Sequence, residues 1–142
     1  MDIILGSDHA GFDLKMICRK YLEEKTPHTV KDAGVHDKKS ADYPDIAHAV
    51  AKAVESGEFD RGILICGTGL GMSMTANRHR NIRAALCYNS YAARMSRLHN
   101  DANILAMGER VLGSGLAIEI LDVFLETPFE GGRHQKRIIK ID

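Results

Sequence analysis

Long apolar runs, an excess of either charge and closely spaced cysteines are all missing from this 142-residue sequence. Its 19 basic and 19 acidic side chains balance, which gives no support for a nucleic-acid or membrane-binding surface. No apolar run approaches the roughly 20 residues that span a bilayer, and Asp2 and Gly6 interrupt the short apolar start, so we expect neither a membrane helix nor a signal peptide. Cys18, Cys66 and Cys87 are odd in number and lack metal-ligand spacing, which argues against zinc and predicts a cytoplasmic protein.

Short apolar runs alternate with segments of helical periodicity along the whole chain. The predicted strands are 3–5, 29–32, 63–66, 82–87 and 103–107. The first predicted helix ends near residue 24, and the second starts at Pro44. Further helices are predicted over 72–78, 90–98 and 113–125, and a last short helix within 133–141. Leu116, Ile120 and Phe124 are expected to share one face of the helix over 113–125. Strands separated by helices predict a parallel sheet with both faces covered. We therefore expect a single domain over 1–142, a three-layer α/β/α fold with a five-stranded, Rossmann-like sheet.

The most informative segment is Ile-Leu-Ile-Cys-Gly-Thr-Gly-Leu-Gly-Met-Ser at 63–73, where a buried strand ends in a thiol and a glycine loop. Ligands of open α/β sheets bind at the carboxyl ends of the strands. Loop amides and the positive end of a helix dipole favour anions there, including a thiolate at Cys66. The loop fits neither a dinucleotide fingerprint nor a thiol phosphatase, because Met72 stands where each needs its glycine or arginine, and it has no P-loop lysine. A plain β–α turn around a buried cysteine remains the alternative.

Polar residues also follow the other predicted strands. Asp8 and His9 fit either the binding of a sugar hydroxyl or phosphate, or a helix cap beside an exposed histidine. Tyr43 either lines the mouth of the cleft or packs against it. Near the end of a predicted helix, His99 stands beside Asn100, and it is the acid–base candidate because histidine titrates near neutral pH. A surface helix end with Asn100 in a turn is the alternative.

The C-terminal segment carries Arg133 and Arg137, four residues apart. On a helix they would share a face and could grip a phosphate together, although a charged tail face is the interpretation favoured by these two residues alone. His48 has no polar company in the sequence and is expected at the surface, and the basic segment 77–81 is expected to be a solvated helix end.

Five motifs in order along nearly the whole chain resemble type B ribose-5-phosphate isomerases, a family that includes galactose-6-phosphate isomerase subunits. The motifs are Ser7-Asp8-His9-Ala10-Gly11, Asp42-Tyr43-Pro44, Ile65-Cys66-Gly67-Thr68-Gly69, Arg97-Leu98-His99-Asn100-Asp101, and Gly131-Gly132-Arg133-His134 with Arg137. The resemblance implies an enzyme of the pentose phosphate pathway that interconverts ribose 5-phosphate and ribulose 5-phosphate through an enediolate, without metal or cofactor. It also implies a homodimer or homotetramer whose active sites take residues from two subunits.

The resemblance assigns roles to matching positions. Cys66 would be the base that moves the proton between two carbons, and His99 would give a proton to the ring oxygen during ring opening. Thr68 is a weaker candidate for assisting that opening. The implied substrate-binding residues are Asp8, His9, Tyr43, Gly67, Gly69, Leu70, Gly71, Asn100, Arg110, Arg133 and Arg137, with the arginines and His9 near the phosphate.

Two positions separate branches of the family. Some relatives have serine in place of Cys66 and a glutamate base in the next helix turn, where this chain has Met72, so the resemblance favours the cysteine mechanism. Galactose-6-phosphate subunits generally lack the histidine of the Arg-x-His-Asn-Asp motif and the Gly-Gly-Arg-His segment; this chain has both, which favours the pentose substrate. The alternatives are an isomerase of a six-carbon sugar such as allose 6-phosphate or galactose 6-phosphate, a sugar-phosphate-binding module without turnover, and a purely structural oligomer subunit.

Overall fold

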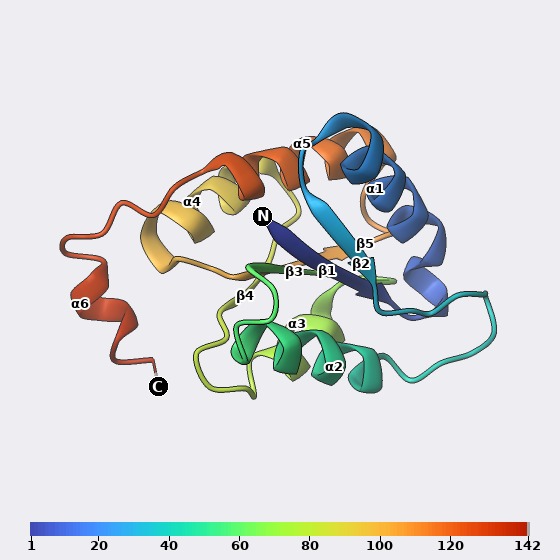
Figure 1. Ribbon diagram of the computed structural model, residues 1–142, viewed down its shortest axis with the longest axis horizontal. Coiled ribbons are helices and arrows are strands. Elements are labelled where there is room, and N and C mark those ends of the chain that lie inside the picture. Colours follow the sequence, from blue (N-terminus) through green and yellow to red (C-terminus); the bar gives the residue numbers. More distant parts are fainter. Residues whose placement is uncertain (142) are drawn as a thin grey trace.

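A computed structural model describes residues 1–141 as a parallel five-stranded sheet between two layers of helices (Figure 1). The strands, in the spatial order β2-β1-β3-β5-β4, are β1 Asp2–Ser7, β2 Thr29–Asp32, β3 Arg61–Cys66, β4 Ala84–Leu86 and β5 Ile104–Gly108. The helices are the 3₁₀ turn η1 His9–Gly11, then α1 Phe12–Lys25, α2 Tyr43–Glu55, α3 Leu70–Ala76, α4 Ser90–Asn100, α5 Ser114–Glu126 and α6 Gln135–Ile138. The predicted three-layer α/β/α architecture is confirmed. Within residues 1–141, no helix combines the length and apolar character that crossing a membrane requires.

The core divides into two clusters, one on each face of the sheet, because successive strand side chains point to opposite faces. In β3, Ile63 and Ile65 join the cluster beneath α1, α4 and α5, whereas Leu64 and Cys66 join the cluster beneath α2 and α3. Both faces are thus buried, which explains why β3 is continuously apolar. The same alternation fixes the face on which the Cys66 thiol lies.

The structure differs from the prediction in the extent of one strand and in the burial along one helix face. Strand β4 covers only 84–86 instead of 82–87, because Asn81 has a positive φ of 60° and the chain turns immediately before the strand. The side chain of Asn103 holds this turn: its Oδ1 accepts from the Arg83 amide at 2.9 Å, and its Nδ2 donates to the Asn81 carbonyl at 2.8 Å. On α5, Ile120 and Phe124 are fully buried, whereas Leu116, which was predicted to share their face, is 39% exposed.

A buried ion pair ties the loop after β2 to helix α1. Lys15 is fully buried, and its Nζ lies 2.7 and 2.8 Å from the two carboxylate oxygens of Asp32. The same ammonium donates to the carbonyl of Val35. Farther along this loop, the amide of Ala41 donates to His9 Nδ1 at 3.2 Å, so the loop borders the carboxyl end of β1.

Candidate active site

The order of the strands places a crevice between β1 and β3. The chain adds β2 on one side of β1 and β3 on the other, and ligands bind at such a switch point beyond the carboxyl ends of the strands. A pocket of about 290 Å³ lies at this edge of the sheet. It is lined by Asp8, His9, Ala10, Tyr43, Cys66, Gly67, Thr68, Gly71 and Arg110, all of which except Ala10 are predicted site residues. We call this the Cys66 pocket.

The thiol of Cys66 lies at the base of this pocket and is held by the glycine loop. The Gly69 amide donates to Cys66 Sγ at 3.0 Å, and the residue is 6% exposed. The other two cysteines lie in apolar surroundings, where burial raises the pKa of Cys18 to about 12 and that of Cys87 to about 11.

The conformation of the loop requires glycine at two of its positions. Gly69 has a φ of +83°, and a Cβ there would lie 2.5 Å from the Leu86 side chain and 2.9 Å from the Met107 backbone. A Cβ at Gly71 would lie 2.6 Å from the ring of Tyr43. The alternating glycines therefore let the loop pass close to β5 and to α2, which brings its amides to the pocket.

Tyr88 is a supporting residue that sequence reasoning missed. Its hydroxyl donates to the carbonyl of Thr68 at 2.7 Å and so holds the centre of the glycine loop from the end of β4. The next residue, Asn89, is the N-cap of α4, with its Oδ1 accepting from the Ala92 amide at 2.8 Å. No local pattern in the sequence signals the contact, because 20 residues separate its partners.

Asp8 caps a helix, as one of its two interpretations predicts, and its binding role stays a prediction. Its Oδ1 accepts from the amides of Ala10 and Gly11, at 2.9 and 3.2 Å, so it caps η1, and it also lines the Cys66 pocket. His9 accepts from a backbone amide at Nδ1, which leaves the proton of the neutral ring on Nε2. Arg110 is exposed, and within residues 1–141 its guanidinium has no hydrogen-bond or ion-pair partner. His9 and Arg110 therefore offer donors suited to a phosphate.

Four predicted site residues lie outside the Cys66 pocket: His99, Asn100, Arg133 and Arg137. We call these four residues the far-edge cluster. Helix α4 runs back from the carboxyl end of β4 and ends at Asn100, shortly before β5 begins at Ile104. Ile104 pairs with Gly62, at the start of β3, whereas Cys66 pairs with the last residue of β5. His99 and Asn100 thus lie at the opposite edge of the sheet from the Cys66 thiol.

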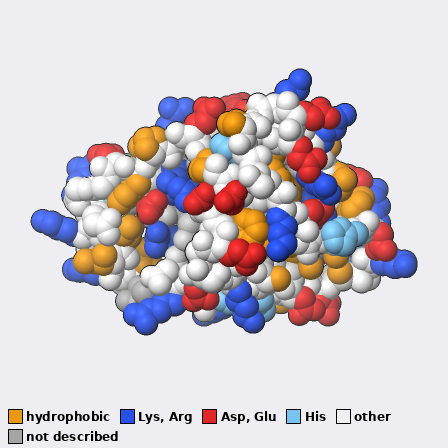
Figure 2. Space-filling model, in the orientation of Figure 1, with side chains coloured by type: hydrophobic (Ala, Val, Ile, Leu, Met, Phe, Trp, Pro, Cys, Tyr) orange, Lys and Arg blue, Asp and Glu red, His pale blue; other side chains and the backbone are white. Residues whose placement is uncertain are grey.

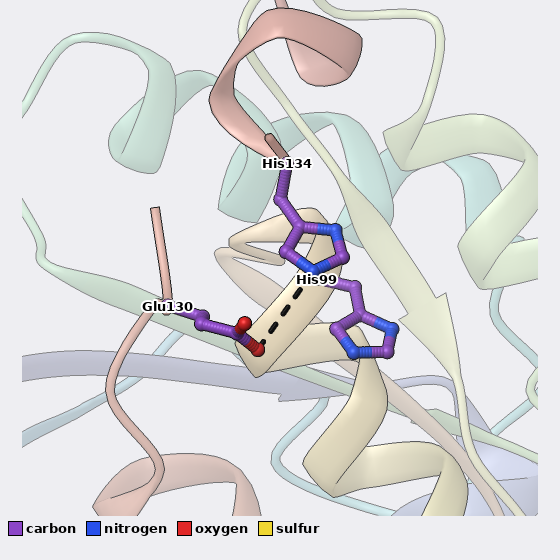
Figure 3. A group of neighbouring side chains, drawn as sticks. All are labelled: His99, Glu130 and His134. Atoms are coloured by element: carbon purple, nitrogen blue, oxygen red, sulfur yellow. Dashed lines mark ion pairs between the residues drawn. The ribbon is translucent and has the colours of Figure 1, made fainter. Parts of the chain in front are cut away.

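The far-edge cluster is organised around a pair of stacked histidines (Figure 3). The rings of His99 and His134 are 4.2 Å apart between centroids and inclined by 12°. Arg133 lies in the turn before α6, which begins at Gln135, so the predicted helical face shared by Arg133 and Arg137 is wrong. Two glycines with positive φ, at 131 and 132, bend the chain there and direct it onto α4.

A match to a protein-family model shows to which family this chain belongs. The model, described as Ribose/Galactose Isomerase, matches residues 3–141. The chain belongs to the ribose/galactose isomerase family. The resemblance inferred from the motifs is therefore confirmed.

Similar proteins span nearly the same length as this family member. Ribose-5-phosphate isomerase B of Escherichia coli is 48% identical over 136 residues, covering 96% of this chain and 91% of the relative. A solved structure of ribose-5-phosphate isomerase B from Clostridium thermocellum has a TM-score of 0.97 at 56% identity, covering 99% of this chain and 95% of that one. A structure of the Mycoplasma genitalium enzyme with bound ribulose-5-phosphate has a TM-score of 0.94 at 42% identity, covering 99% and 93%.

Among the described residues of this ribose/galactose isomerase family member, one group of side chains has donor atoms close enough together to be tested as a metal site. The donor atoms of His99, Glu130 and His134 lie within 4.8 Å of one another. The histidine rings are nearly parallel, so their in-plane lone pairs do not converge on one point, and Arg133 Nε donates to His134 Nε2 at 3.4 Å. The arrangement does not suit a cation.

Another pair of histidines corrects a prediction. His48 was expected at the surface without polar partners, but its Nδ1 lies 2.7 Å from His79 Nε2, and His79 Nδ1 lies 3.3 Å from a Glu55 oxygen. Only 11% of the His79 side chain is exposed, whereas the other four residues of 77–81 are exposed, so the predicted solvated helix end is confirmed except at His79. These contacts fasten α2 to the chain that follows α3, away from the Cys66 pocket.

Proposed function

We propose that this chain interconverts ribose 5-phosphate and ribulose 5-phosphate, the aldose–ketose step of the pentose phosphate pathway, as a homo-oligomer. The observation that carries the proposal is the Cys66 thiol, which accepts a backbone hydrogen bond inside a pocket at the switch point of the sheet. The family model and the ribose-5-phosphate isomerase B relatives support the same substrate class.

The proposed reaction moves one proton between neighbouring carbons. Cys66, as thiolate, removes the proton from carbon 2 of the open-chain aldose, and the electron pair moves to form an enediolate. The thiol then returns the proton to carbon 1, and the hydroxyl proton of oxygen 2 moves to oxygen 1, which gives the ketose. The step is redox-neutral overall, so it consumes no oxidant or reductant.

Backbone amides of the glycine loop stabilise the enediolate in this proposal. The first amides of a helix have no intrahelical acceptor, and Gly71, in the first turn of α3, lines the pocket together with Gly67. A preorganised amide aimed at a developing oxyanion contributes about 3 kcal/mol to transition-state stability. Arg110 and His9, which also line the pocket, hold the phosphate, and this fixes the reacting carbons beside the thiol.

The Cys66 pocket does not contain His99, the proposed ring-opening acid, so we propose that each active site is formed by two copies of the chain. His99 lies at the opposite edge of its own sheet, so it reaches a Cys66 pocket only in another copy of the chain. In a two-fold dimer the far-edge cluster of each copy covers the pocket of the other, because such an interface is reciprocal. His99 then protonates the ring oxygen, while Asn100 binds substrate and Arg133 and Arg137 add to the phosphate site.

The surface supports burial against a second copy. Leu70 and Met74 lie one turn apart on α3 beside the pocket and are 45% and 62% exposed. Figure 2 shows basic and apolar side chains gathered at the end of the molecule where α6 lies, and Ile139 and Ile141 are exposed there. Exposed apolar groups of this kind mark an interface, and the basic groups suit a partner's phosphate-binding pocket.

We also propose that the chain forms one domain over residues 1–142 and works in the cytoplasm. A single sheet joins the described residues, and two core clusters on its faces account for nearly all of their buried apolar side chains. The three cysteines are free, which is the usual state of thiols in a reducing compartment.

Turnover of ribose 5-phosphate by metal-stripped protein tests the proposal, with Cys66→Ala and Cys66→Ser compared with wild type. We expect robust wild-type conversion and a loss of at least about a thousandfold in kcat in both variants, as for other catalytic bases or nucleophiles. Activity that persists in Cys66→Ala would remove the cysteine from the mechanism.

The other possible functions give different outcomes in the same assay series. Wild-type turnover of a six-carbon phosphate in preference to ribose 5-phosphate would assign the chain to hexose substrates, because one extra carbon changes the required pocket length. Binding of sugar phosphates without turnover would indicate a binding module. Neither binding nor turnover would indicate a structural subunit.

A further inference from the structure

His134 occupies an unusual position between two residues of the far-edge cluster. It is 4% exposed, although it lies in a turn near the C-terminus. One face of its ring lies on His99 (Figure 3). Its Nε2 accepts from Arg133 Nε at 3.4 Å. The carboxylate of Glu130 lies 3.7 Å from the same nitrogen.

The hydrogen-bond partners determine the form of the His134 ring. A guanidinium only donates, so the contact with Arg133 requires a lone pair on His134 Nε2. The neutral ring with its proton on Nδ1 provides that lone pair. Burial, the neighbouring His99 and the two arginines, Arg133 and Arg137, lower the pKa of His134, and Glu130 opposes them. The net direction agrees with a neutral ring at neutral pH.

A neutral ring in this position has two consequences. Stacked on His99, it restricts rotation of that imidazole while adding no positive charge beside it. Through its Nε2 it holds the side chain of Arg133, a predicted phosphate ligand, in one orientation. The face of the ring and its edge thus act on different residues.

We propose that His134 is a positioning residue with two separable tasks, orienting His99 through its ring face and Arg133 through its Nε2 lone pair. This inference rests on the proposed function, in which His99 opens the sugar ring and Arg133 binds the phosphate. A purely structural role, in which the stack only fastens the C-terminal segment to α4, would affect both kinetic constants and stability together.

Two substitutions separate the tasks. His134→Phe keeps an aromatic face for His99 but removes the acceptor for Arg133, so we expect KM for ribose 5-phosphate to rise about tenfold with kcat within about twofold. His134→Gln keeps a hydrogen-bond acceptor but removes the ring, so we expect kcat to fall about tenfold with KM within about threefold. Both variants should keep the wild-type oligomeric state.

Two measurements without turnover complete the test. In NMR titrations of the histidine ring protons, the His99 resonance should shift its midpoint in His134→Gln and remain near wild type in His134→Phe. Binding of inorganic phosphate should weaken in His134→Phe and stay near wild type in His134→Gln. If wild type does not turn over ribose 5-phosphate, the proposed function fails while these two measurements still decide the role of His134. Equal effects of both variants on kcat, KM and thermal stability, or no effect of either, would overturn the inference.

Discussion

Replacing Lys15 with methionine should destabilise the fold markedly, because it leaves a carboxylate buried without its main partner. Asp32 has only 7% of its side chain exposed, and both of its oxygens receive hydrogen bonds from the Lys15 ammonium. After the substitution, the carboxylate would keep only the Gly34 amide at 2.8 Å and Arg19 at 3.3 Å. Val35 would also lose a donor to its carbonyl.

The expected magnitude follows from these contacts. Breaking a buried ion pair by removing one partner costs about 3–5 kcal/mol. The remaining contacts of Asp32 place Lys15→Met near the lower end, about 3 kcal/mol, which corresponds to a melting temperature lower by about 10 °C for a chain of this size. The double variant Lys15→Met/Asp32→Asn should lose less than the sum of the single losses, by about 1–3 kcal/mol, since neither charge is then left alone.

The same interaction makes the stability of the fold depend on pH in a direction that can be predicted. Burial opposes ionisation of Asp32, but hydrogen bonds from Lys15 and the Gly34 amide outweigh it and hold the pKa of Asp32 below its ordinary value. The stability from this group is therefore present above the unfolded pKa of about 4 and is lost as the pH falls below it toward the folded pKa. The difference in the free energy of unfolding between wild type and Asp32→Asn should accordingly become smaller as the pH is lowered.

Thermal melts followed by circular dichroism, at neutral pH and in a series below about pH 4, measure all these quantities. A loss of less than about 3 °C in Lys15→Met, or additive losses in the double variant, would refute the reasoning. An advantage of wild type over Asp32→Asn that grows in acid would refute the assigned sign.

Two further predictions concern the glycine loop and its thiol. Gly108→Ala should lower kcat/KM about a hundredfold, because its Cβ would lie 2.6 Å from the backbone of the glycine loop. The matched variant Gly115→Ala has open space around the new Cβ, so its kcat/KM should stay within about twofold of wild type. Equal activities of the two variants would contradict this prediction. Iodoacetamide at about pH 7.5 should modify Cys66 alone, since burial raises the pKa values of Cys18 and Cys87, and mass spectrometry showing a second modified thiol in the native protein would contradict it.

The sheet and the Cys66 pocket could be predicted because their signals are local. The apolar run that ends at Cys66 and the glycines after it define a strand, a turn and a helix start, and parallel strands bring such ends together. The exact extent of β4 could not be predicted, because its start depends on side-chain hydrogen bonds from Asn103 to residues about 20 positions away. The contact of His48 with His79 spans 31 residues and has no local signal either.

The separation of His99 from Cys66 is a consequence of element lengths. Helix α4 has 11 residues and a length of about 16 Å, and the six residues of β3 span about 20 Å, so α4 returns the chain along most of the length of the strands. A residue at the end of such a helix must lie at the opposite edge from the end of the strand. Motifs alone name both residues and do not reveal this separation.

The shared site is tested most directly by combining two inactive variants. Cys66→Ala and His99→Asn carry different affinity tags, are co-expressed, and the hetero-oligomer is purified through both tags. In a two-fold dimer with shared sites, one of its two sites contains neither substitution, so we predict about half of the wild-type activity. Activity no higher than that of the separate variants would contradict the account, because it would mean that Cys66 and His99 never meet in a site between two chains.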